Sequence, residues 1–190
     1  IDRQILGILV DPIRAHLKLT DFQIGILGGP VFFVPYFLGG LIGGWAVDRY
    51  HRPTIIALAV ASWSVATAAC ALSGNFIQIA LARMGVGVCE GSLGPGAHSL
   101  IADSFDKKKL PMAMSLYTAS NAVGTSLALI VGGFILQWAG QRTWDLQFLG
   151  TMHPWQFAFM AVSIPGLILA PAIWVFLRIP PREVHPHYSQ

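Results

Sequence analysis

Charged residues are scarce in this sequence. Asp, Glu, Lys and Arg together make up 11% of its 190 residues, whereas soluble domains carry about 25%. Hydrophobic residues make up 54% of the chain, and the mean hydropathy is +0.61. These values exclude an ordinary soluble domain, and the sequence therefore predicts an integral membrane protein.

Cysteines and clustered reactive residues are also few. The two cysteines, Cys70 and Cys89, lie in apolar segments; we interpret them as small apolar side chains that carry no information about redox compartment. No nucleophile and base occur at a catalytic spacing, and no Cys/His cluster has metal-ligand spacing. His185 and His187 fall in a Pro-rich tail that we expect to be disordered. We therefore expect no enzyme activity, no metal, no cofactor and no nucleic-acid partner.

Long apolar runs dominate the chain. A short first run, Ile5–Val10, is below the roughly 20 residues that a spanning helix needs, so we expect the chain to begin partway through a first helix. Five further segments are predicted to be transmembrane helices: Phe22–Val47, Ile55–Leu72, Phe76–Ala102, Met112–Trp138 and Trp155–Leu177. Thr20 or Asp21 is a suitable N-cap for the second helix. The expected fold is all-α, with six transmembrane helices over residues 1–177 and a polar tail at 178–190.

Basic residues lie mainly on one side of these segments. The connections 48–54 and 103–111 and the tail hold seven Lys or Arg, whereas the opposite side holds three, namely Arg14, Lys18 and Arg142. Short cytoplasmic loops are enriched in Lys and Arg. We therefore expect both connections, the tail and the N-terminus to be cytoplasmic, in a multi-pass protein of a bacterial inner membrane.

Among the Asp, Glu, Lys and Arg residues, four fall inside the predicted helices: Asp2, Arg3, Arg83 and Glu90. Inserting such a residue at the centre of a membrane helix costs about 2.5–3.5 kcal/mol of free energy. These residues therefore usually face the bundle interior or a water-filled cavity. Arg83 and Glu90 are seven residues apart, about two turns, with Gly87 between them on nearly the same face. We expect both to line one polar cavity, where Glu90 carries a proton and Arg83 holds an anionic group. The alternative is a static ion pair that locks the bundle.

The adjacent residues Asp2 and Arg3 point about 100° apart on their helix. At most one of them therefore faces the cavity squarely. We expect Asp2 to be a second protonatable group and Arg3 to contribute to the substrate cavity, unless the pair lies at the level of the lipid headgroups.

Polar residues also follow one stripe of the fifth predicted helix. Tyr117, Asn121 and Gly124 lie at i, i+4 and i+7. This stripe fits either substrate contact or ordinary interhelical hydrogen bonding. On the fourth helix, we expect His98 to be a buried, hydrogen-bonded histidine rather than a ligand.

The stretch GGWAVDRYHRP, after the second predicted helix, resembles the signature loop of the major facilitator superfamily, Gly-x-x-x-Asp-Arg/Lys-x-Gly-Arg-Arg/Lys. The matching residues are Gly44, Asp48, Arg49 and Arg52. His51 stands where the family has glycine, and Pro53 replaces the last basic residue. The loop is therefore expected to turn differently and to lose one positive contact.

The resemblance implies a cytoplasmic gate built from this loop. Asp48 would face a helix N-terminus of the opposite half, where negative charge is stabilised. Arg49 or Arg52 would pair with Asp103 at the end of the fourth helix. The alternative is that these basic residues only reflect the general excess of Lys and Arg in cytoplasmic loops. We prefer this interpretation for the three lysines at 107–109.

Three further stretches are similar to Spinster-like transporters of that superfamily: DRQILGILVDPIRAHLKLTDFQIGIL, ARMGVGVCEGSLGPGAHSLIADSF and HPWQFAFMAVSIPGL. Gln156 stands where that group usually has Arg. The fifth helix has Gly124 and the pair 132–133 but no Gly-Pro pair, so it lacks the full antiporter motif. The resemblance implies the N-terminal six-helix half of a twelve-helix fold, with 178–190 as the start of the central linker.

The resemblance also implies a function. In the Spinster-like pattern, the residues that match Asp2, Arg83 and Glu90 serve proton coupling and cavity chemistry. We expect a secondary active transporter that works by alternating access and moves an amphipathic or small organic anion. Its partners would be that substrate, protons, membrane lipids and the C-terminal six-helix half. Two alternatives stay open: a non-transporting sensor or scaffold with the same fold, and a facilitator that moves no proton.

Overall fold

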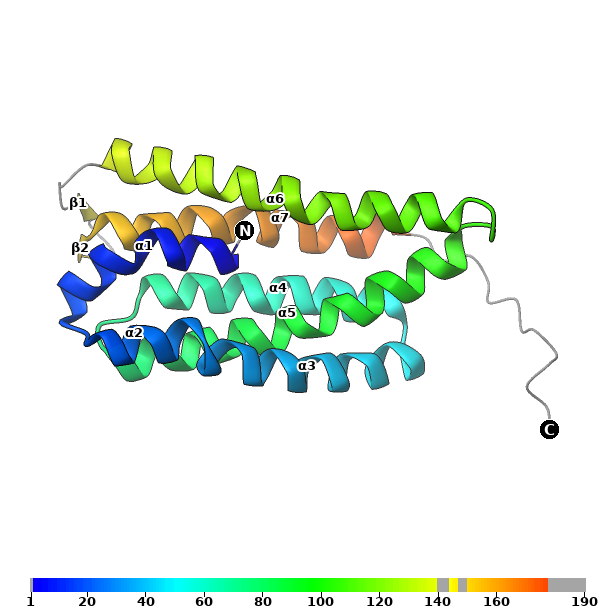
Figure 1. Ribbon diagram of the computed structural model, residues 1–190, viewed down its shortest axis with the longest axis horizontal. Helices are drawn as coiled ribbons and strands as arrows, with labels where there is room; N and C mark the ends of the chain where they lie inside the picture. Colours follow the sequence, from blue (N-terminus) through cyan, green and yellow to red (C-terminus); the bar gives the residue numbers. More distant parts are fainter. Residues whose placement is uncertain (1, 140–143, 147–149, 178–190) are drawn as a thin grey trace.

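The computed structural model describes residues 2–139, 144–146 and 150–177, with side chains for all of these except 2–4, 136, 138, 139, 144–146, 150 and 151. The described residues form α1 (Asp2–Leu17), α2 (Asp21–Gly28), α3 (Pro30–Arg49), α4 (Arg52–Ala71), α5 (Phe76–Ser104), α6 (Leu110–Ala139), β1 (Trp144–Leu146), β2 (Gly150–Met152) and α7 (Pro154–Phe176). The helices run along one common axis and form an elongated bundle (Figure 1). This confirms the largely helical fold that the sequence predicts. The tail 178–190 lies outside the described residues.

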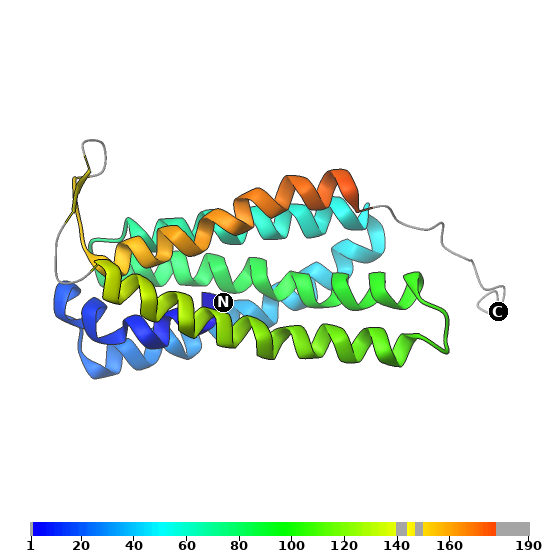
Figure 2. The same ribbon diagram turned by 90° about the horizontal axis from the view of Figure 1, so that it is seen from above.

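The helices pack in a fixed order around the bundle. α3 packs along α5, α4 packs along both α5 and α7, and α1 lies against α6 and α7. Figure 2 shows α4 and α7 on one side of the bundle, with α6 and α1 on the other. Within the described part of the chain, five stretches are long and apolar enough to cross a membrane: Asp21–Arg49, Arg52–Ala71, Phe76–Ser104, Leu110–Ile135 and Pro154–Phe176.

The two ends of the bundle differ in character. The turns at 50–51 and 105–109 lie at one end, which we call the basic end, and α7 also ends there (Figure 1). The antiparallel hairpin of β1 and β2 lies at the other, the hairpin end, and pairs Trp144 with Met152. The sequence analysis did not predict these two strands.

The second predicted helix, Phe22–Val47, is interrupted in the structure. α2 ends at Gly28 and α3 begins at Pro30, with the backbone of Gly29 at φ −107° and ψ −107°. Proline has no backbone N–H to donate to the preceding turn, and it is favoured at the first position of a new helix. The prediction of one unbroken helix is therefore wrong at this point, although the two pieces together still form one candidate span.

The start of α2 is fixed by its cap. The hydroxyl of Thr20 accepts a hydrogen bond from the backbone N of Gln23 at 3.3 Å, and the backbone N of Thr20 donates to Oε1 of Gln23 at 2.9 Å. This reciprocal pair is a capping box. Thr20 is therefore the N-cap, while Asp21 forms an ion pair with Arg14 at 2.7 Å across the turn.

α3 and α5 approach each other through glycines. A Cβ added at Gly87 on α5 would lie 2.6 Å from the carbonyl oxygen of Phe32 and 3.3 Å from the backbone N of Tyr36. Gly91 faces the carbonyl of Tyr36, and Gly39 of α3 faces the carbonyl of Val88, each without room for a side chain. Small residues of this kind allow the close backbone contact on which helix packing in membranes depends.

An aromatic cluster joins α1 to α7 at the hairpin end. The rings of His16 and His153 lie 3.6 Å apart between centroids, and Nε1 of Trp155 donates to Nδ1 of His16 at 3.1 Å. His16 lies in the last turn of α1, outside the five candidate spans. Burial, and secondarily the neighbouring His153, lower the pKa of His16 below its ordinary value of 6.5. The cluster therefore holds His16 in its neutral form.

Candidate functional site

A polar cavity of about 410 Å³ lies between α3, α5 and α6. We call it the Glu90 cavity. Its polar wall consists of Tyr36 from α3, Glu90 and His98 from α5, and Tyr117, Ser120, Asn121 and Thr125 from α6. The structure thus brings together three of the site residues that the sequence analysis selected, from two different helices: Glu90, Tyr117 and Asn121.

Glu90 lies at the middle of α5, fourteen residues from each end of the helix. Its Oε2 atom is shielded from solvent. Gly87 and Gly91, on either side of it along the helix, allow α3 to pack closely there. A carboxylate therefore lines a polar cavity near the middle of a helix long enough to span a bilayer.

Arg83 lines a different cavity. Its side chain is buried, with 2% of its surface exposed, and its guanidinium carbon lies 4.9 Å from the centroid of the Phe32 ring. This second cavity, also of about 410 Å³, is otherwise mostly apolar and is lined by Leu6, Gly7, Val10, Ile24, Gly28, Phe32 and Phe33. We call it the Arg83 cavity. A guanidinium over an aromatic face and beside apolar walls favours an anion with an apolar body.

The two cavities adjoin at a pair of stacked rings. Phe32 lines the Arg83 cavity and Tyr36 lines the Glu90 cavity, and their ring centroids are 5.8 Å apart. Arg83 and Glu90 are seven residues apart on α5, a rise of about 10 Å, and Arg83 lies over the Phe32 ring. Arg83 and Glu90 therefore line different cavities of this half, and their joint role in one site stays a prediction.

Asp2 and Arg3 begin α1, but their side chains lie outside the described residues. Leu6 and Gly7, one turn further along the same helix, line the Arg83 cavity. The assignment of Asp2 to proton coupling and of Arg3 to the substrate cavity stays a prediction.

An ion pair joins α4 to α5 at the basic end. The guanidinium of Arg52, buried at the start of α4, pairs with Oδ2 of Asp103 near the end of α5. Arg49 instead lies over the ring of Trp45, with its guanidinium carbon 5.1 Å from the centroid. Of the two basic residues considered in the sequence analysis, Arg52 therefore makes the contact with Asp103.

The other two residues of the signature loop lie on the last turns of α3. A Cβ added at Gly44 would make ordinary contact with Pro95 of α5, at 3.8 Å. Asp48 is exposed at the end of the helix. The gate role of Gly44 and Asp48 depends on the opposite half and stays a prediction.

The sequence analysis missed several cavity residues. His98 is exposed on the wall of the Glu90 cavity rather than buried, so the expectation of a buried histidine is wrong. Ser120 and Thr125 extend the stripe of Tyr117 and Asn121, and the helical spacing that revealed the stripe also includes them. Tyr36 lies in a predominantly apolar helix, where no pattern distinguishes it.

Comparison with known proteins agrees with this architecture. The family model of the Major Facilitator Superfamily matches residues 1–189. The crystal structure of a bacterial homolog of the human lysosomal transporter Spinster, in an inward-facing and occupied conformation, superposes with a TM-score of 0.85 at 30% sequence identity, covering 96% of this chain and 42% of that chain.

Two relatives give similar matches. The cis,cis-muconate transport protein of Acinetobacter baylyi is 27% identical over 182 residues, which are 96% of this chain and 42% of the relative. The sphingosine-1-phosphate transporter SPNS2 of Xenopus tropicalis is 29% identical over 149 residues, 75% of this chain and 28% of the relative. This chain therefore spans less than half the length of these proteins, in agreement with one six-helix half of a twelve-helix fold. A family match over nearly the whole chain, a multi-pass helical bundle and the shared Spinster architecture together show that the chain belongs to the major facilitator superfamily and is Spinster-like.

Proposed function

We propose that this chain is the N-terminal half of a secondary active transporter that works by alternating access and couples transport to protons. The observation that carries the proposal is Glu90, a carboxylate at the centre of a spanning helix and on the wall of a polar cavity. Ionisable groups at such depth are costly and mark ion or substrate pathways. The basic end would face the cytoplasm, following the excess of Lys and Arg at that end.

Proton coupling requires a group that gains and loses a proton as the cavity changes access. Glu90 would take up a proton while the cavity is open to one side and release it while the cavity is open to the other. Asp2, on the helix that lines the Arg83 cavity, is proposed as the second such group. The close packing of α3 against α5 at Gly87 would keep Glu90 in one position during this exchange.

The substrate is proposed to be an organic anion, either amphipathic or small. Arg83 would bind its negative group, and the apolar walls of the Arg83 cavity would contact its body. The relatives named for cis,cis-muconate and for sphingosine-1-phosphate support an acidic substrate. Arg3, Tyr117 and Asn121 are proposed to complete the cavity contacts, with the opposite half supplying the rest.

The gate is proposed to lie at the basic end. The Arg52–Asp103 ion pair fixes the start of α4 to the end of α5, and this would make that end of the half move as one body. Asp48 would then face a helix N-terminus of the opposite half when the gate is closed. Rocking of the two halves would break that contact and open the cavity.

A flux measurement tests the proposal. The full-length protein is reconstituted in liposomes that contain a pH-sensitive dye, and candidate organic anions are added outside. We expect substrate-dependent proton movement in the wild type and in Asp106→Asn, a control that removes a carboxylate outside the spanning helices. We expect none in Glu90→Gln. Substrate flux without proton movement in the wild type would favour a facilitator, and binding without flux would favour a sensor.

A further inference from the structure

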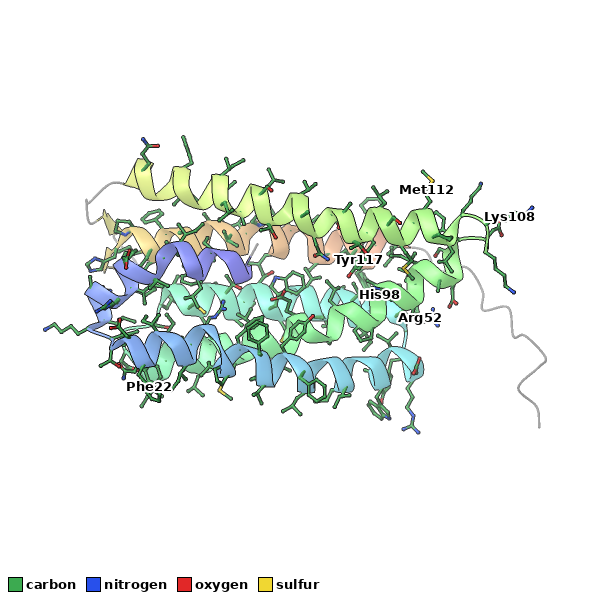
Figure 3. All side chains as sticks on the ribbon, viewed as in Figure 1. Phe22, Arg52, His98, Lys108, Met112 and Tyr117 are labelled. Carbon is green, nitrogen blue, oxygen red and sulfur yellow. The ribbon has the colours of Figure 1, made fainter. Side chains whose placement is uncertain are left out.

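His98 occupies a distinctive place in the Glu90 cavity. It lies on α5 eight residues after Glu90, and both residues line the same cavity wall. Eight residues advance a helix by about 12 Å, so His98 lies well beyond Glu90 toward the basic end. Figure 3 shows His98 from α5 and Tyr117 from α6 on facing helices, nearer to Lys108 than to Phe22. Their rings meet edge to face, 5.0 Å apart between centroids.

The hydrogen bond of His98 fixes which ring nitrogen carries its proton. Nδ1 lies 2.8 Å from the carbonyl oxygen of Gly94. A carbonyl oxygen can only accept, so Nδ1 must be the donor and must be protonated. In the neutral ring, Nε2 therefore has a lone pair that can accept a proton. The backbone contact with Gly94 therefore occupies Nδ1 and leaves Nε2 as the acceptor nitrogen.

We propose that His98 is a proton-transfer residue that connects Glu90 with the cytoplasmic mouth of the cavity. The inference rests on the proposed proton coupling through Glu90. The carboxylic acid of Glu90 gives its proton to water in the cavity, and that water passes a proton to Nε2 of His98. The imidazolium then releases the Nε2 proton to water at the basic end, and the neutral ring with its Nδ1–H···O bond to Gly94 is restored.

The walls of the cavity suit such a path. Ser120, Asn121 and Thr125 of α6 place hydroxyl and amide groups along the interval between Glu90 and His98. A cavity of about 410 Å³ has room for several water molecules. Water held by hydroxyl and amide groups can relay a proton over a distance that two side chains cannot cover directly.

Few titratable or charged side chains lie near His98 in the described part of the chain. From α3 and α6, the titratable groups on the cavity wall are Tyr36 and Tyr117, and from α5 the other is Glu90. From α4, Arg52 approaches the end of α5, where it pairs with Asp103. Among the described side chains, Glu90 is therefore the carboxylate that shares this cavity wall with His98.

The test separates proton transfer from substrate binding. Full-length protein in liposomes is assayed for net proton-coupled uptake and for substrate counterflow, in which no net proton moves. His98→Asn keeps a donor for the Gly94 carbonyl but cannot be protonated, and His98→Gln is a second variant in case the first does not fold. His187→Asn, in the tail, controls for loss of an imidazole elsewhere.

We expect His98→Asn to lower net uptake by about 100-fold or more, the lower end of the loss for an acid–base group, while counterflow stays within about twofold. Its net uptake should also lose the dependence on cytoplasmic pH that the wild type shows. Unchanged net uptake, or an equal loss of uptake and counterflow, would overturn the proposal. If the wild type moves no protons with substrate, the proposed coupling itself fails. That failure differs from a failure of the His98 proposal, in which the wild type moves protons and His98→Asn moves them equally well.

Discussion

Replacing Gly87 with alanine should separate α3 from α5 beside the candidate site. The added Cβ would lie 2.6 Å from the Phe32 carbonyl oxygen and 3.3 Å from the Tyr36 backbone N. Favourable carbon contacts begin near 3.5 Å, so the two backbones must move apart by roughly 1 Å. The two nearest atoms belong to the α3 backbone, and the third, Cβ of Pro35 at 3.4 Å, is held in the proline ring. No side-chain rotation can therefore relieve the contact.

Two opposing effects set the expected change in the free energy of unfolding of Gly87→Ala. Overpacking costs about 1–3 kcal/mol, while alanine is more favourable than glycine in a helix interior by about 1 kcal/mol. We therefore expect Gly87→Ala to lower stability by up to about 2 kcal/mol. Gly94→Ala, seven residues further along α5, is the matched control because a Cβ there meets no atom within 4 Å.

Thermal unfolding of the full-length protein in detergent, followed by intrinsic fluorescence, is a suitable assay. The account predicts a lower unfolding temperature for Gly87→Ala and an unchanged or higher one for Gly94→Ala. Equal unfolding temperatures for the two variants would refute the reasoning, since the same substitution on the same helix would then be insensitive to the distance between α3 and α5.

Two other predictions concern the ends of the bundle. Arg52→Gln should lower stability by on the order of 2 kcal/mol, less than the 3–5 kcal/mol of fully buried pairs, because water reaches Asp103. A double variant that exchanges Arg52 and Asp103 should recover part of this loss. If it recovers none, the two residues do not act as a pair. At the hairpin end, the lowered pKa of His16 stabilises the fold above the ordinary value of 6.5, and this contribution is lost as the pH falls from there toward the folded pKa. Unfolding temperatures between about pH 7 and 5 should therefore fall more for the wild type than for His16→Phe. Parallel curves would contradict a pKa of His16 that is lowered chiefly by burial.

The features that the sequence predicted are those that one segment specifies alone. Long apolar runs define the candidate spans, and of the two predicted N-caps, Thr20 and Asp21, the structure selects Thr20. The resemblance to the superfamily loop implied a pairing of Asp103 with Arg49 or Arg52, and the structure shows it with Arg52. The break at Gly29 had its signal in the Gly-Gly-Pro stretch, but the apolar run on both sides outweighed it.

The features that the sequence did not predict depend on contacts between helices. Arg83 and Glu90 share a helix face, but they line two different cavities, with Phe32 beside the first and Tyr36 beside the second. His98 is on the cavity wall because α6 places Tyr117 opposite it. Neither arrangement follows from the periodicity of one helix.

The most direct test of the central claim is uphill accumulation driven by a pH gradient alone. Liposomes containing the full-length protein receive an imposed gradient of one pH unit and an equal substrate concentration on both sides. One proton per substrate supplies about 1.4 kcal/mol, enough for about tenfold accumulation. The account predicts that the wild type approaches this ratio, while Glu90→Gln leaves the concentrations equal. Accumulation by Glu90→Gln to the wild-type ratio would contradict the account, because the proton would then cross without the carboxylate at the centre of α5.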